Sequence, residues 1–224
     1  MIHVENITRT YDMHGAEVRA LDGVSLDIAQ GEFVAITGPS GSGKSTLLNV
    51  LGCLDKPDAG SYVLDGQEVS GLDDEAISTV RNRKIGFIFQ SFHLLPRLTV
   101  LENVLLPLRF TREPKPDVTA RAKELLARVG LADRMDHRPT QLSGGQMQRA
   151  AIARSLILSP ALLLADEPTG NLDSKSAADV LRLLDELHDQ GQTIVLVTHD
   201  NEIAAHAPRH VRLRDGKVES DAKR

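Results

Sequence analysis

The feature that most constrains this chain is a glycine-rich segment at residues 38–45 with the sequence GPSGSGKS. It follows a nearly continuous apolar run at residues 32–37, which is typical of a strand buried on both faces of a sheet. Residues 44–51 then form a predicted helix, with Gly52 placed to end it. A strand, a glycine-rich turn and a helix in this order predict a loop that holds phosphate groups.

The segment fits the pattern G-x-x-x-x-G-K-[ST] in full, so we interpret it as the phosphate loop of a nucleotide-binding protein. Its glycines let successive main-chain amides point at the phosphates, where Lys44 offsets the γ-phosphate charge and the Ser45 hydroxyl ligates Mg²⁺. A chance glycine-rich turn is the alternative, and the flanking strand and helix argue against it. The residues expected to bind nucleotide here are Gly38, Pro39, Ser40, Gly41, Ser42, Gly43, Lys44, Ser45 and Thr46.

Further apolar runs place this loop in an α/β fold. Residues 162–165 and 193–198 are typical of buried strands, and residues 176–190 between them have leucines at helical spacing. A strand, a helix and a strand in succession predict a mostly parallel sheet with crossover helices. Residues 24–28 alternate apolar and polar side chains, which predicts a half-buried strand.

The stretch at residues 91–159 differs from this pattern because it is mostly helical in character. One helix is predicted over residues 120–129, closed by Gly130, and residues 113–117 are typical of a surface loop. We therefore expect one domain over residues 1–224, with a helical lobe inserted into its α/β core at about residues 91–159.

Two carboxylates end one of the predicted strands. Asp166 is positioned to hold Mg²⁺, directly or through water, and Glu167 then faces the γ-phosphate, where it can act as general base for the attacking water. An acidic strand end that faces solvent is the alternative. His199 follows another strand at the ligand edge of the sheet, and we interpret it as a hydrogen-bond partner of the γ-phosphate and the water.

A second short motif, LSGGQ at residues 142–146, stands at the start of a predicted helix. A serine and two glycines at a helix N-terminus can hold an anion. One nucleotide does not need two such sites in one subunit, but two subunits that face head to tail would use both. A plain helix cap is the alternative. The residues of this motif expected to bind nucleotide are Ser143, Gly144, Gly145 and Gln146.

Taken together, GPSGSGKS, LSGGQ, LLLADEP and His199 resemble the ATP-binding subunit of ABC transporters, over about residues 2–218. The resemblance implies an α/β ABC ATPase core with a mostly parallel sheet, an antiparallel β portion and an inserted helical lobe. It also implies a homodimer that binds and hydrolyses two MgATP. By the same resemblance, Tyr11 would stack on adenine, although a tyrosine on the face of a strand is the alternative. Gln90 would link Mg²⁺ and water to the transmembrane contact. Asp173 would lie in a loop that crosses the dimer interface.

Longer segments, among them LGCLDKPDAGSYVLDG and ADEPTGNLD, resemble the group that contains the macrolide exporter MacB and the lipoprotein-release ATPase LolD. In that group, closure on ATP moves periplasmic parts of the transmembrane subunit, which expels substrates or releases lipoproteins. MacB carries its membrane segment on the same chain, whereas this chain stops at Arg224. We therefore expect a separate-subunit member that drives a transmembrane permease, and the resemblance allows a periplasmic adaptor as a further partner.

The apolar stretch at residues 92–96 follows Gln90 in the sequence. By resemblance, part of it lines the groove that receives a short helix of the permease. Ordinary core packing is the alternative.

Composition restricts the partners and the compartment. A net charge of −5 over 224 residues argues against a nucleic-acid partner, because phosphate binding favours a basic face. The single cysteine, Cys53, excludes an intrachain disulfide, and its apolar setting predicts core packing. Neither a signal peptide nor an apolar run near the roughly 18 residues of a membrane helix is present. We expect a cytoplasmic protein, held at the inner face of the membrane by the permease.

Soluble ABC ATPases that act on DNA or on ribosomes are the alternative function. The DNA-repair and chromosome-architecture members need long coiled-coil insertions, and this sequence has no heptad run. The translation factors carry two ATPase units in one chain, whereas this sequence has one phosphate loop and one LSGGQ motif. The transport subunit is therefore the favoured prediction.

Overall fold

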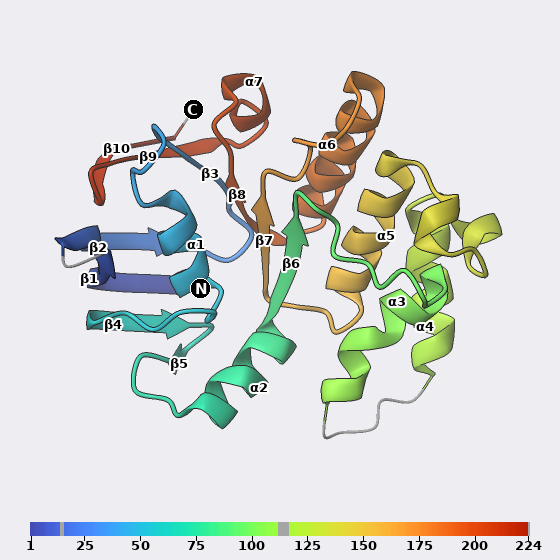
Figure 1. The fold of residues 1–224 in the computed structure, drawn as a ribbon, viewed down its shortest axis with the longest axis horizontal. Helices are drawn as coiled ribbons and strands as arrows, with labels where there is room; N and C mark the ends of the chain where they lie inside the picture. The colour runs from blue at the N-terminus through green and yellow to red at the C-terminus, as the bar shows by residue number, and fades with distance from the viewer. Residues whose placement is uncertain (14–15, 112–116, 224) are drawn as a thin grey trace.

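The structure is a computed structural model that describes residues 1–13, 16–111 and 117–223. The surface loop predicted at residues 113–117 thus lies outside the described residues, apart from Asp117, which precedes a helix. The chain builds two sheets and a set of helices around them, and Figure 1 shows their arrangement.

A six-stranded sheet in the order β10-β9-β3-β8-β7-β6 runs through the centre of the molecule (Figure 1). Strands β6, β7, β8, β3 and β9 are parallel to their neighbours, and only β10 pairs antiparallel, with β9. The strands are β3 Phe33–Thr37, β6 Ile85–Phe89, β7 Leu162–Asp166, β8 Thr193–Val197, β9 Arg209–Arg214 and β10 Lys217–Lys223.

A second, antiparallel sheet has the order β2-β1-β4-β5 and lies on the left of Figure 1, next to the first helix. It consists of β1 Ile2–Met13, β2 Ala16–Ile28, β4 Ala59–Leu64 and β5 Gln67–Glu68. The predicted strand at residues 24–28 is the C-terminal part of β2. Burial alternates strictly only in that part of the strand, which explains why the rest of it lacks a clear pattern in the sequence.

The helices fall into two groups. The first covers α1 Lys44–Leu51, α2 Asp74–Lys84, α6 Ser174–Asp189 and α7 Asn201–Ala204, which connect or flank the strands. The second gathers on the right of Figure 1 and includes α3 Val100–Leu105, η1 Leu106–Phe110, α4 Val118–Arg128, η2 Ala132–Arg134, η3 Pro139–Gln141 and α5 Gly144–Leu156. All of the second group lies between β6 and β7 in the sequence, within the predicted helical lobe.

The central strands β3, β7 and β8 are buried on both faces of the sheet. Along β7, Leu163 and Ala165 join one apolar cluster with α3, α4, α5 and α6, whereas Leu162 and Leu164 join another with α1, α2 and the antiparallel sheet. Because successive side chains of a strand point to opposite faces, an unbroken apolar run supplies both clusters. Burial on both faces fixes the register of these strands and therefore the level at which each one ends.

Helix α1 ends where the sequence predicts, but for a different reason. Gly52 has a right-handed backbone with φ of −79°, so the position does not need the left-handed freedom of glycine. A Cβ atom there would lie 2.6 Å from the Phe87 ring. The glycine therefore allows the end of α1 to pack closely against β6.

Candidate active site

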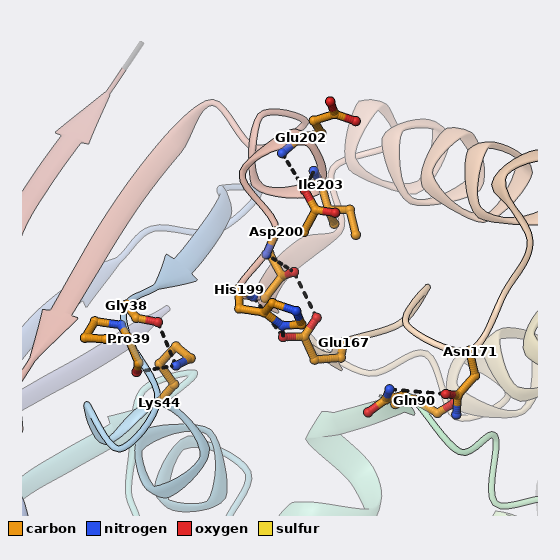
Figure 2. Close-up of polar contacts among 11 residues, drawn as sticks. Gly38, Pro39, Lys44, Gln90, Glu167, Asn171, His199, Asp200, Glu202 and Ile203 are labelled. Atoms are coloured by element: carbon orange, nitrogen blue, oxygen red, sulfur yellow. Dashed lines mark hydrogen bonds and ion pairs between the residues drawn. The ribbon is translucent and has the colours of Figure 1, made fainter.

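The carboxyl ends of neighbouring parallel strands meet at one edge of the central sheet. The phosphate loop follows β3, Gln90 follows β6, Glu167 follows β7 and His199 lies just beyond β8 (Figure 2). Main-chain hydrogen bonds extend the sheet past its strands, since the Glu167 amide donates to the Val197 carbonyl at 2.9 Å. The strand ends thus hold these loops in fixed positions relative to one another.

The phosphate loop passes too close to its neighbours for any residue but glycine at two positions. Gly38 has φ of +148°, and a Cβ atom there would lie 2.2 Å from the Leu213 carbonyl oxygen. Gly43 has φ of +99°, and its Cβ would lie 2.3 Å from the Ala20 carbonyl oxygen. The loop is therefore held against β9 on one side and β2 on the other.

The N-terminus of α1 is left without a side-chain cap. Its N-cap residue is Gly43, and its first turn contains no acidic residue. Among the longer helices, α2, α5 and α6 begin with serine or aspartate caps, whereas α4 also has no side-chain cap hydrogen bond. The first amides of α1 can therefore bond an anion, with the partial positive charge of the helix N-terminus in support.

Lys44 Nζ donates to the carbonyls of Gly38 and Pro39, both at 2.9 Å, which folds its ammonium group over the loop (Figure 2). To bind a phosphate it exchanges these carbonyls for stronger, charged acceptors. The hydroxyl of Ser42 in the same loop is buried and has no hydrogen-bond partner among the described residues. The loop thus contains donors that a phosphate would satisfy.

The Asp166 carboxylate at the end of β7 is electrostatically coupled to Lys44. Burial, with the neighbouring Glu167 charge, raises the pKa of Asp166, while Lys44 acts in the opposite sense. Glu167 has φ of +44°, a left-handed backbone that turns its side chain toward β8. Its Oε1 accepts hydrogen bonds from the His199 amide at 2.8 Å and from His199 Nδ1 at 2.6 Å, and its Oε2 accepts from Thr198 Oγ1 at 2.9 Å (Figure 2).

This contact fixes the tautomer of His199. A carboxylate can only accept, so the proton of the neutral ring lies on Nδ1 and Nε2 carries the lone pair. The His199 side chain is 79% exposed, so Nε2 is open to a ligand. In this arrangement the neutral ring accepts a hydrogen bond from water through Nε2, and the ring donates to a phosphate only when it is doubly protonated.

The residues present fit a Mg²⁺ ion that is shared with phosphates. Ser45, Gln90 and Asp166 offer oxygen donors with one carboxylate among them, and Mg²⁺ prefers one or two carboxylates together with substrate phosphates. Gln90 Nε2 donates to Asn171 Oδ1 at 3.3 Å, which leaves the Gln90 carbonyl oxygen for a metal or water (Figure 2). Within the described part of the chain, no group of three or more His, Cys, Asp or Glu side chains is placed to hold a metal ion. The Mg²⁺ would therefore depend on oxygen ligands from the phosphates and from Ser45 and Gln90 as well.

The LSGGQ motif lies at the start of α5 and forms a complete capping box. Ser143 Oγ accepts from the Gln146 amide at 3.3 Å, and Gln146 Oε1 accepts from the Ser143 amide at 2.9 Å. Gly145 lies against α6, where a Cβ atom would meet Ser176 Oγ at 2.6 Å. Between described residues, no hydrogen bond or ion pair joins residues 143–146 to the phosphate loop of the same chain, so the structure does not bring these two predicted site segments together.

Comparison with known proteins identifies this arrangement. Residues 21–170 match the sequence profile described as ABC transporter. The chain belongs to the ABC transporter family. An uncharacterized ABC transporter ATP-binding protein of Thermotoga maritima is 52% identical over 224 residues, with 100% of this chain and 96% of that protein covered. The macrolide export ATP-binding/permease protein MacB of Chlorobaculum tepidum is also 52% identical over the whole chain, which spans 34% of that protein's length.

Solved structures of the cassette MJ0796 share the fold with a TM-score of 0.90. One is a dimeric, post-hydrolysis state bound to ADP and Pi and is 47% identical, with 100% of this chain and 98% of that chain covered. These matches confirm the predicted fold and family, and they make the chain an ATP hydrolase of the ABC type. None of the helices in the described part of the chain combines the length and the apolar character needed to span a bilayer.

The remaining predicted residues lie around this centre. Asp173 caps α6, where its oxygens accept from the Ser176 amide at 3.0 Å and from Ser176 Oγ at 2.7 Å. Tyr11 is half-buried on β1; its hydroxyl donates to Asp55 at 2.6 Å, and the Arg9 guanidinium lies 4.8 Å from the ring centroid. Arg9 and Asp55 therefore fix the ring that the ABC resemblance assigns to adenine.

The stretch at residues 92–96 has mixed surroundings. Leu94 packs against the cluster of the helical segments, whereas Leu95 is 45% exposed. Phe92 and His93 have left-handed backbones, and Arg154 of α5 donates to both of their carbonyls. Core packing thus accounts for Leu94, and the other side chains of the stretch remain available to a partner.

Two carboxamide side chains near the site were not predicted from the sequence. They are Gln148 and Asn171, and Asn171 is the hydrogen-bond partner of Gln90. Gln148 is fully buried, four residues before the buried Ile152 of the same helix. A polar residue on the apolar stripe of a helix is a signal that the sequence does contain. Asn171 belongs to the predicted interface loop, but its contact with Gln90 joins residues 81 positions apart, which no local pattern reveals.

We predict that Asp166→Asn stabilises the protein when neither Mg²⁺ nor nucleotide is added, while it abolishes ATP hydrolysis. The raised pKa means that folding disfavours the charged carboxylate. This penalty acts above the folded pKa and vanishes below the ordinary value of 3.8, where the group is protonated in both states. Differential scanning fluorimetry at pH 8 is expected to show a higher Tm for the variant than for the wild type.

Asp221→Asn is the control of opposite sign. A hydrogen bond from Arg209 lowers the pKa of Asp221, so its carboxylate is favoured by folding and its loss is expected to lower Tm. A lower Tm for Asp166→Asn at pH 8 would contradict the assignment of Asp166 as a destabilising buried charge.

Proposed function

We propose that this chain is the ATP-hydrolysing subunit of a transporter, that it dimerises head to tail around two MgATP, and that it drives a separate transmembrane permease. The observation that carries the proposal is the separation of two anion-binding helix ends. The uncapped start of α1 lies at the sheet edge with Glu167, whereas Ser143 lies at the start of α5 without a bond to the phosphate loop. A second copy would bring its Ser143 to the phosphates bound here.

The capping box at Ser143 is compatible with this second role. The Ser143 oxygen accepts from the Gln146 amide, so its hydroxyl proton is free to donate to a phosphate, and the side chain is exposed. The helix-cap alternative and the proposed trans contact are therefore two uses of the same residue. The dimeric MJ0796 cassettes support this arrangement.

In the proposed cycle, Tyr11 stacks on the adenine, and the amides of residues 38–46 with Lys44 bind the phosphates. Mg²⁺, when bound with the nucleotide through Ser45, Asp166 and Gln90, neutralises phosphate charge. Glu167 accepts a proton from the water that attacks the γ-phosphorus, while the bond between that phosphorus and the bridging oxygen breaks to give ADP and phosphate. His199, held by Glu167, accepts a hydrogen bond from the water through Nε2 when its ring is neutral, and it donates to the γ-phosphate when its ring is doubly protonated.

A groove beside Gln90 is the proposed docking site of a short permease helix. It has a volume of about 540 Å³ and lies between the core and the helical segments, which we propose form one lobe at about residues 91–159. Its apolar wall includes Phe87, Phe89, His93, Leu106, Pro107 and Phe110. Phe110 is 73% exposed, which is unusual for so large an apolar side chain and typical of a contact surface.

The proposed work is export or mechanical transduction across the cell envelope. The MacB relative joins a cassette like this one to a permease in one protein, which supports a permease as the partner of this chain. The assembly would place the chain at the inner face of the membrane, with a periplasmic adaptor on the far side in systems that use one.

We expect Glu167→Gln to bind MgATP with near-normal affinity but to hydrolyse it about 10²–10⁴-fold more slowly, because an amide cannot take the proton from water. Since hydrolysis reopens the dimer, the variant should accumulate as an ATP-bound dimer. Size-exclusion chromatography with MgATP and with MgADP measures this. Glu186→Gln, an exposed change on α6, is the control and should behave as wild type. A Glu167→Gln protein that stays monomeric in saturating MgATP, or turns over at the wild-type rate, contradicts the proposed cycle.

Ser143→Arg tests the trans contact. Its bulk at the interface is expected to block dimer closure and hydrolysis, while the isolated monomer still binds ATP because its own phosphate loop is unchanged. Equilibrium binding of a fluorescent ATP analogue and turnover are measured side by side, with Ser220→Arg on the exposed face of β10 as the control. If the monomer loses ATP binding instead, Ser143 serves the nucleotide of its own chain.

Phe110→Ser tests the groove. The isolated subunit is expected to keep its ATPase rate, but stimulation of that rate by the reconstituted permease should be lost, because the apolar wall no longer holds the docked helix. Arg109→Ser, a change of the exposed neighbour that does not line the groove, is the control. Full permease stimulation of Phe110→Ser would exclude the groove as the docking site.

A further inference from the structure

Gln148 lies in the second turn of α5 and is completely buried. Its Nε2 donates two hydrogen bonds, to the Phe89 carbonyl at 3.1 Å and to the Pro168 carbonyl at 2.5 Å. Its Oε1 has no hydrogen-bond partner among the described residues. A buried carboxamide of this kind is costly unless its geometry is needed, because each polar atom loses its bonds to water.

The two carbonyls belong to the ends of adjacent strands that carry the reacting groups. Phe89 is the last residue of β6 and precedes Gln90, and Pro168 directly follows Glu167 at the end of β7. In the register of the sheet, Phe89 pairs with Asp166. One side chain of α5 therefore clamps both strand ends at the level where Gln90 and Glu167 begin.

The start of the same helix presents Ser143 for the proposed contact with the partner's ATP. At a rise of about 1.5 Å per residue, Ser143 and Gln148 lie less than about 10 Å apart along a continuous helix. A displacement of Ser143 is therefore carried to the two carbonyls without a flexible segment between them. Gln90 Nε2 also donates to Asn171 Oδ1 at 3.3 Å, and Asn171 Nδ2 donates to the Gln90 main-chain carbonyl at 3.1 Å. These two bonds tie the clamped loops to each other (Figure 2).

The hydrogen bonding around this link is incomplete. The described residues contain three buried side-chain atoms without a partner: Ser42 Oγ in the phosphate loop, Gln148 Oε1, and Thr169 Oγ1 next to Pro168. Gln148 Oε1 is a hydrogen-bond acceptor, and the Thr169 hydroxyl can donate, so these two atoms are chemically complementary. A rearrangement of α5 against residues 168–170 that brought these two atoms together would satisfy both of them.

We propose that Gln148 is a positioning residue that couples binding of the partner's nucleotide at Ser143 to the placement of Gln90 and Glu167 in its own chain. Each active site would then be set only when its subunit has closed on the ATP held by the other, so that the two sites act together. This inference rests on the proposed head-to-tail dimer, and it assigns the communication between the sites to one carboxamide.

Gln148→Met tests this inference, because methionine keeps the volume and removes both donors. We expect the affinity of the monomer for a fluorescent ATP analogue to stay within about twofold. The kcat should fall by about 10- to 100-fold, the scale that follows from a small misplacement of reacting groups. The Hill coefficient for ATP should fall from the wild-type value to 1.

Gln192→Met is the matched control. Gln192 also donates through Nε2 to main-chain carbonyls, those of Pro160, Ala161 and Thr193, but it does so at the opposite end of the same sheet. Comparable changes in Tm for the two variants, with loss of kcat and cooperativity only in Gln148→Met, support the proposal. Wild-type kcat or cooperativity in Gln148→Met, or an equal loss in Gln192→Met, overturns it.

If Gln148→Met does not fold, Gln148→Asn serves in its place, because it keeps an amide that is too short to reach both carbonyls and should lose kcat and cooperativity in the same way. Unchanged kinetics in that variant overturn the proposal. The proposed dimer is tested separately by the ATP-bound dimer of Glu167→Gln. Failure of that dimer refutes the proposed function, whereas failure of the Gln148 tests alone leaves it standing.

Discussion

The constraint on which the rest of the structure depends is the burial of the central parallel strands on both faces. Because β3, β8 and β7 each send alternate side chains into two separate apolar clusters, a slip of one residue would exchange the contents of both clusters. The register is therefore fixed, and with it the level at which each strand ends. The phosphate loop, Asp166 and His199 come together because the strands before them cannot shift.

Three of the polar side chains at this edge, those of Lys44, Glu167 and Gln90, have partners within the protein. Lys44 bonds to carbonyls of its own loop, Glu167 to Thr198 and His199, and Gln90 to Asn171. For these three side chains, binding of MgATP is an exchange of hydrogen bonds, and the internal partners limit the desolvation penalty before the ligand arrives. Asp166 is different, since burial raises its pKa and no hydrogen bond to its side chain in the described residues offsets that effect. The charge of the Asp166 carboxylate would therefore be stabilised by a nearby cation more than any other charge at this edge.

The sequence predicts these elements where a local pattern carries them. The strand–loop–helix unit of residues 32–51 and the strand of residues 162–165 follow from apolar runs and a glycine pattern, and they appear in the structure almost residue for residue. The N-terminal half of β2 could not be predicted, because its exposed, mixed side chains show no alternation. Contacts such as Gln148 with Phe89 depend on how the helical segments pack on the sheet, which no local pattern encodes. Leu94 shows the same limit, because its apolar setting fits both a core and a docking surface until its neighbours are known.

The placement of α5 decides whether the chain can act alone. Its first turn packs on α6 so closely that position 145 must be glycine, and its second turn clamps the ends of β6 and β7 through Gln148. The helix is therefore fixed to the active site of its own chain while its exposed end, Ser143, has no bond to that chain's phosphate loop. Helix α5 thus contacts the active site of its own chain and presents Ser143 outward. In the proposed dimer, the second subunit supplies the ATP that Ser143 contacts. If Ser143 binds the partner's nucleotide as proposed, the geometry of a single helix explains the need for a dimer. Ser143 and Gln148, which bonds to the carbonyls of Phe89 and Pro168, lie little more than one turn apart on that helix.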